Sequence, residues 1–116
     1  MHLPTGDYRV LLLWGRFAHI NSKHWVIEFV MSETGERGSA FVFASDIGKI
    51  SAAANMLIGG GRLAPRDPDA ERPVLTLSLK YDRRFGNTRA TGAVKTDKTM
   101  ACDIRIYGQH FEPQEF

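Results

Sequence analysis

The residues best suited to binding chemistry lie between Leu79 and Arg89, in the segment LKYDRRFGNTR. The segment continues an alternating strand pattern and predicts a hairpin tip that carries cations and two aromatic rings. Cations neutralise phosphates and rings stack on bases, and a single-stranded nucleic-acid site uses both. We expect phosphate contacts from Lys80, Arg83, Arg84, Arg89, Lys95 and Lys98, and base stacking by Tyr81, Phe85 and Trp14, with Arg16 beside Trp14.

The charge of the chain is unevenly distributed. The formal net charge is only +2, and residues 1–61 carry five cations and five anions. Residues 72–105 carry eight cations and three anions, a local excess of five positive charges. Such an excess can attract a polyanion although the whole chain is nearly neutral. The alternative is a solvated surface of mixed charge.

Residue types that carry catalysis or bind metals are not arranged in any known pattern. His19 and His24 are five residues apart, which matches no zinc signature, and Cys102 falls on the apolar side of an expected strand. The glycines of 59–61 followed by Arg62 could hold a phosphate, but they follow an expected helix instead of opening one, so we interpret them as a helix stop. We therefore expect no catalytic residue, no cofactor and no metal, and an enzyme of unrecognised type is the third functional alternative.

Length and composition indicate one folded domain over residues 1–116. The chain is 43% hydrophobic and 24% charged, values typical of a globular protein. No apolar run approaches the ~20 residues that cross a bilayer, and the N-terminus lacks the pattern of a signal peptide. With a single cysteine the chain cannot form an intrachain disulfide. We expect a cytoplasmic protein without membrane contact.

The hydrophobic periodicity predicts three strands, one helix and three further strands. The helix is expected over Asp46–Ile58, with Ser45 or Asp46 as N-cap and Gly59–Gly61 as its stop. Its buried stripe would be Ile47, Ile50, Ala54, Leu57 and Ile58. A loop is expected over residues 62–72 and a turn over residues 96–99. The expected strands are Tyr8–Ile20, which bends at Gly15, Trp25–Met31, Ala40–Ala44, Val74–Tyr81, Thr88–Lys95 and Met100–Tyr107.

This order, mostly β with one helix in a β3-α-β3 arrangement, is that of an OB-like Greek-key barrel. An open antiparallel sheet packed on one helix fits the same pattern. The run VLLLWGRF from Val10 to Phe17 resembles the first strand of OB-fold single-stranded-DNA-binding proteins, where an apolar run meets a glycine at a bend. The resemblance implies that Trp14, Arg16 and Phe17 lie near the concave face on which an OB-fold binds its strand.

The C-terminal residues 109–116 are short, polar and interrupted by a proline, which indicates a frayed tail. The final acid and phenylalanine are similar, in a much reduced way, to the partner-docking end of bacterial single-stranded-DNA-binding proteins. The predicted function is a small domain that binds single-stranded nucleic acid with little sequence preference. The alternative is a protein–protein interaction module that meets an acidic protein surface, such as a small inhibitor or accessory protein of a bacterial mobile element. The sequence leaves a homo-oligomer open.

Overall fold

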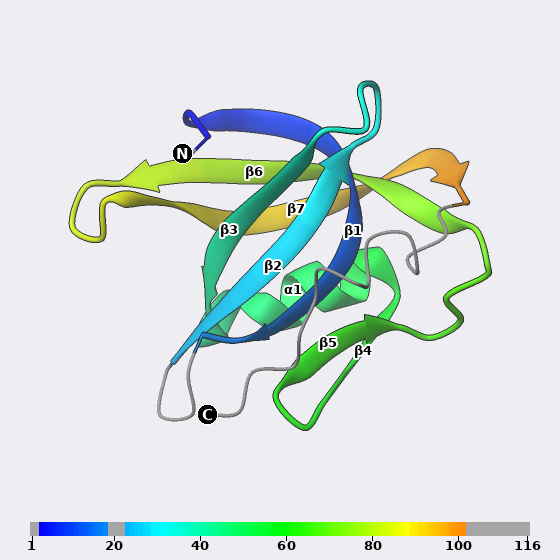
Figure 1. Cartoon of the computed structure of the whole chain (residues 1–116), viewed down its shortest axis with the longest axis horizontal. Coiled ribbons are helices and arrows are strands. Elements are labelled where there is room, and N and C mark those ends of the chain that lie inside the picture. The colour runs from blue at the N-terminus through cyan, green and yellow to red at the C-terminus, as the bar shows by residue number, and fades with distance from the viewer. Residues whose placement is uncertain (1–2, 19–22, 102–116) are drawn as a thin grey trace.

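Five long strands pair in a closed ring in the computed structural model, which describes residues 3–18 and 23–101 (Figure 1). The strand β1 pairs with β2 and β6, β3 pairs with β2 and β7, and β6 pairs with β7. All of these pairs are antiparallel except β3–β7. The bounds are β1 (Gly6–Phe17), β2 (His24–Met31), β3 (Arg37–Phe43), β6 (Arg72–Asp82) and β7 (Asn87–Met100).

The ring order β1-β2-β3-β7-β6, with a helix between β3 and β6, is that of an OB-like barrel. The protein is mostly β with a single helix in its described part, as the sequence predicts, and the closed ring excludes the open sheet. Gly15 lies where β1 pairs with Ile27 of β2 on one side and Leu63 of β5 (Arg62–Pro65) on the other. An added Cβ there would lie 3.2 Å from both side chains, so the close approach of three strands favours a glycine.

The core fills the ring because alternate residues of each strand point inward. On β2, Trp25, Ile27 and Phe29 are buried, and the outward residues between them are partly exposed. The helix α1 (Ala44–Ala54) adds Ile47, Ile50 and Ala54 to the same core. The remaining members of this core are Val10, Leu12, Ala40, Val42, Met56, Leu63, Leu75, Leu77, Leu79 and Ala90.

The helix is shorter than the periodicity predicts. It begins at Ala44 without a side-chain cap, so Ser45 and Asp46 lie in its first turn and neither is the N-cap. It ends at Asn55, whose left-handed conformation (φ 55°, ψ 49°) stops it before the expected end at Ile58. The placement of Leu57 and Ile58 in the buried stripe is therefore wrong, and these side chains are 49% and 46% exposed.

Residues after the helix form a hairpin that the sequence analysis assigned to a helix stop and a loop. Met56–Gly59 is β4, and it pairs with β5, which in turn pairs with the end of β1. Gly60 and Gly61 have φ of +58° and +72° and connect the paired residues Gly59 and Arg62. Two positive φ values in succession are what a tight two-residue hairpin needs, so the glycines are there for the turn.

The strand β7 is longer than expected. It runs through residues 96–99, where a turn was predicted, because the start of β6 supplies its partners: Arg72 pairs with Met100 and Pro73 with Thr99. The predicted strand Met100–Tyr107 beyond Ala101, Cys102 on it, and the predicted tail 109–116 all lie outside the described residues.

Candidate nucleic-acid interface

The loop between β6 and β7 is folded around the carboxylate of Asp82. The backbone N–H and the side-chain Nε of Arg84 donate to Oδ1 of Asp82 at 3.0 and 3.1 Å, and Arg84 Nη2 donates to Oδ2 at 2.8 Å. The hydrogen bonds from Arg84 are the main cause that lowers the pKa of the Asp82 carboxyl to about 2, against the opposing effect of its burial. The backbone N–H of Phe85 donates to the Asp82 carbonyl, which fixes the backbone position from which the Phe85 side chain projects.

Phe85 packs onto three rings from other strands, and these four residues form what we call the aromatic cluster. The centroid of the Phe85 ring lies 5.3 Å from that of His24 on β2, and 5.3 and 6.1 Å from those of Phe41 and Phe43 on β3. The other three rings also contact one another, with centroids 5.1 to 5.7 Å apart. Phe41 is nearly covered, whereas Phe85 remains 49% exposed. The cluster thus presents ring surface on the outside of the barrel.

Two arginines lie over this cluster. The Arg84 guanidinium is 5.4 Å from the Phe85 centroid, and the Arg89 guanidinium is 4.4 Å from that of Phe43. Arg89 is also 3.8 Å from carboxylate oxygens of both Asp46 and Asp82, and its side chain is only 17% exposed. Arg89 therefore mainly holds α1, β7 and the loop together. Arg84 is 71% exposed and can meet a ligand.

The other predicted cations fall in two places. Lys80, opposite Arg89, and Arg83 in the loop are exposed next to the cluster. Lys95 and Lys98 are exposed on the far part of β7, about 20 and 30 Å of extended strand from Arg89 at about 3.3 Å per residue. The six predicted phosphate contacts therefore do not form one patch.

Trp14 and Tyr81 lie apart from the aromatic cluster. Trp14 is 4% exposed, and its indole N–H donates to Glu28 Oε2 at 2.7 Å, so its ring has no open face for a base. Tyr81 follows Lys80 on β6 and by alternation faces away from the outer side, and its backbone N–H donates to Thr5 Oγ1. Of the three predicted stacking rings, only Phe85 lies in the aromatic cluster.

The strand registers bring Arg16 into line with the cluster. Directly paired residues of neighbouring strands have side chains on the same face. When these pairs are followed from strand to strand, five pairs in succession define a cross-strand row on the outside of the sheet. Its members, from β5 through β1, β2, β3 and β7 to β6, are Arg62, Arg16, Val26, Phe41, Arg89 and Lys80. The row has cations at both ends and the aromatic cluster near its middle.

His24, Phe41 and Phe43 are not among the predicted site residues, and Arg62 was considered for a phosphate but set aside. Phe41 and Phe43 alternate on β3 with Ala40 and Val42, which occupy the inner face of the strand. A strand that is apolar on both faces must be covered on the outside as well, and this signal was present in the sequence. Arg62 was set aside because the glycines before it were interpreted as a helix stop and not as the turn of the β4–β5 hairpin.

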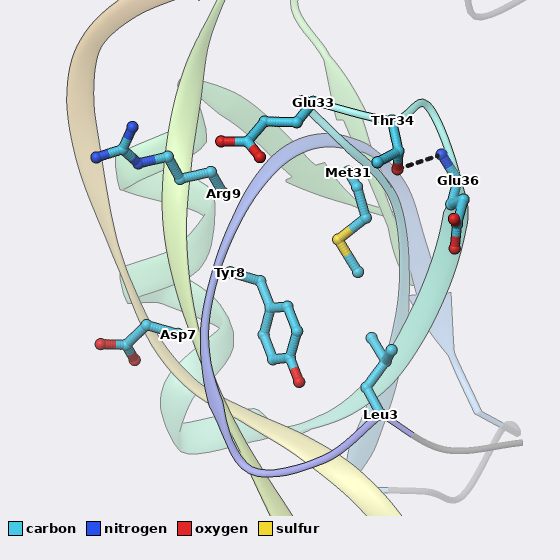
Figure 2. A pocket seen from close by; sticks show the side chains of 8 residues that line it. All are labelled: Leu3, Asp7, Tyr8, Arg9, Met31, Glu33, Thr34 and Glu36. Atoms are coloured by element: carbon cyan, nitrogen blue, oxygen red, sulfur yellow. Dashed lines mark hydrogen bonds between the residues drawn. The ribbon is translucent and has the colours of Figure 1, made fainter.

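A pocket of about 520 Å³ lies elsewhere, between the start of β1 and the turn that joins β2 to β3. Figure 2 shows Leu3, Tyr8 and Met31 directed toward its middle, with carboxylates at its margin. Three acids and one arginine line it, which disfavours a phosphate. The aromatic cluster lies at the opposite end of β2 and β3, so the pocket and the cluster are separate features. The lining acids and arginine are Asp7, Glu33, Glu36 and Arg9.

Comparisons with protein-family models, with curated proteins and with solved structures find no match to this chain. Among residues 3–18 and 23–101, no group of three His, Cys, Asp or Glu side chains is placed to hold a metal ion. The same residues contain no helix long and apolar enough to span a membrane.

Proposed function

We propose that this domain binds single-stranded nucleic acid across the outer face of β2, β3 and β7. The observation that supports the proposal is the aromatic cluster, four rings in mutual contact on the outside of an OB-like barrel with guanidinium groups at 4.4 and 5.4 Å from two of them. OB-folds bind oligonucleotides on the face of their second and third strands and on the loop between their last two. Here that face and that loop meet at Phe85.

The chemistry of the cluster fits a single strand. Unpaired bases offer their faces to rings, and each such stack contributes about 1–3 kcal/mol whatever the base. Arg83, Arg84 and Lys80 are exposed beside the rings and would contact the phosphates. Rings that stack on base faces do not read base edges, and arginines that contact phosphates carry no sequence information, so little sequence preference is expected.

A fluorescence-anisotropy titration with labelled single-stranded DNA and RNA at two or more salt concentrations tests the proposal. Phe85→Ala should cost ~1–3 kcal/mol of binding and leave the log–log salt slope unchanged, because a stack releases no counterion. Arg83→Ala should flatten that slope by about 0.7. Lys98→Ala, which removes the same charge from the far part of β7, is the matched control and should change neither.

The proposal fails if the wild-type protein binds no single strand at low salt, where the electrostatic attraction is strongest. It also fails if Lys98→Ala and Arg83→Ala weaken binding equally. In that case the charge of the whole chain, and not this face, would attract the nucleic acid.

A protein-interaction module is the second candidate, and the β4–β5 hairpin favours it. β4 is an edge strand of the described sheet, and it carries Leu57 and Ile58, which are 49% and 46% exposed. An apolar edge without charged side chains can pair with a strand of another protein. Concentration-dependent sedimentation of the wild type, abolished in Leu57→Lys, would support self-pairing through this edge.

A further inference from the structure

We propose that Arg16 and Arg62 form a second phosphate-binding site, at the end of the cross-strand row opposite Lys80. This inference rests on the proposed function and deepens it, because it sets the length of single strand that the domain takes. The site is built in part from the β4–β5 hairpin, which is an addition to the five-stranded ring.

The tip of that hairpin is fixed to the barrel. The Phe17 backbone N–H donates to the Gly61 carbonyl at 2.9 Å. The Phe17 ring lies so close to Gly61 that a Cβ added to Gly61 would be 2.7 Å from the ring. The same ring packs against Trp25, with 4.5 Å between the ring centroids. Arg62, the next residue, is thereby held directly opposite Arg16. The two cations are placed by contacts that do not depend on a ligand.

The pairing of Arg16 with Arg62 puts like charges opposite each other on one face, which disfavours folding. Arg16 Nη1 donates to the Phe17 carbonyl at 3.0 Å, which holds its guanidinium at the end of β1. Glu28 lies on the same outer face of β2, but its carboxylate accepts from Trp14 and Arg37. In the described part of the chain no carboxylate pairs with Arg62. A phosphate beside Arg62 would supply the counter-charge that the described carboxylates do not give it, and Arg16 stands directly opposite.

The spacing of the strands gives the length of the ligand. Five strand-to-strand steps of about 4.8 Å separate Lys80 from Arg62, roughly 24 Å along the sheet. This span suits a short oligonucleotide at the low end of the ~4–16 nucleotides that one OB-fold covers. A strand that lies on the aromatic cluster and reaches Arg62 must therefore be longer than one that lies on the cluster alone.

Oligothymidylates three to twelve nucleotides long, titrated by fluorescence anisotropy, test the inference. For the wild type, affinity should rise with length and level off once the row is covered. Arg62→Ala should weaken the longest strands by roughly five- to tenfold at 50 mM salt and flatten their salt slope by about 0.7, the share of one phosphate contact. It should leave the shortest strands unchanged, and Arg62→Lys should restore most of the slope.

Arg66→Ala is the matched control, because Arg66 is exposed just beyond β5 and lies outside the row. Equal losses in Arg62→Ala and Arg66→Ala would overturn the second site, as would an unchanged length dependence in Arg62→Ala. Either result would leave binding at the aromatic cluster intact. Failure of every oligonucleotide to bind the wild type is a different outcome, which removes the proposed function and the second site together.

Discussion

The β6–β7 and β4–β5 hairpins are held against the same barrel by different interactions. The loop of β6–β7 is fixed by side chains: Asp82 binds Arg84, and Phe85 packs on rings of β2 and β3. The tip of β4–β5 is fixed mainly by backbone: Gly60 and Gly61 make the turn, and the Gly61 carbonyl accepts from Phe17, whose ring packs on Gly61. Interactions between side chains can respond to pH and to a ligand, whereas a glycine turn responds mainly to substitution.

The largest predicted effect tests whether the chain really leaves the helix at Asn55. Ile50→Ala should cost ~2–5 kcal/mol of unfolding free energy, because Ile50 is completely buried between α1 and the barrel. Leu57→Ala should cost less than about 0.5 kcal/mol, because Leu57 is half exposed on β4. Urea unfolding measures both. Similar costs for the two would mean that Leu57 belongs to the helical stripe and that the β4–β5 hairpin is not formed.

The second effect separates the two glycines of the β4–β5 turn. Gly60→Ala places a side chain at φ +58° in open space and should cost about 1–2 kcal/mol. Gly61→Ala adds a clash with the Phe17 ring to the same backbone strain and should cost about 2–4 kcal/mol. Thermal or urea unfolding compares them. Equal costs would show that the Phe17 ring moves aside freely and does not fix the tip.

The two hairpins also differ in how well the sequence predicts them. In β6 the residues Leu75, Leu77 and Leu79 alternate over a long strand, so the pattern shows the strand and its hairpin clearly. In β4 and β5 only four residues lie on each side of the turn, and Leu57 and Ile58 continue the spacing of α1 by coincidence. The helix ends at the left-handed Asn55, and the hairpin that follows is held by the pairing of β5 with β1, which joins residues far apart in the sequence.

The candidate interface was also predictable only in part, because part of it is local in the sequence and part depends on strand pairing. Phe85 and the loop arginines stand together in the sequence, and the structure places them together. The aromatic partners of Phe85 come from β2 and β3, and Arg62 comes from β5, so their meeting depends on register between strands. The sequence also could not show that Arg89 is held by Asp46 as well as Asp82, because Asp46 lies in α1, far from Arg89 along the chain.

A third prediction concerns the stability of the aromatic cluster itself. Phe85→Ala should cost about 1 kcal/mol of unfolding free energy, because its ring makes edge-on contacts worth about 0.5–1.5 kcal/mol each but stays half exposed. Urea unfolding of the isolated variant measures this. A loss above about 3 kcal/mol would show that Phe85 acts as a core residue, and the ring would then not be available to stack on a base.

The smallest effect follows from the pKa of Asp82, which Arg84 lowers from 3.8 to about 2. Because the folded value lies below the unfolded value, the ionised carboxylate favours the closed loop above about pH 4, and this contribution is lost as the pH falls through about 2. The exposed Arg84 guanidinium is screened by solvent and salt, so the effect should be local and should weaken in high salt.

Amide signals of Arg84 and Phe85, followed by NMR between pH 4 and pH 1.5, should report the opening of the β6–β7 loop with a midpoint near 2. Asp82→Asn should remove this transition, because the amide does not ionise. The signals of Gly60 and Gly61 should stay constant over the same range, since the β4–β5 turn is held by its backbone. If the glycine signals change with the same midpoint, the acid opens the barrel as a whole, and the two hairpins do not respond independently.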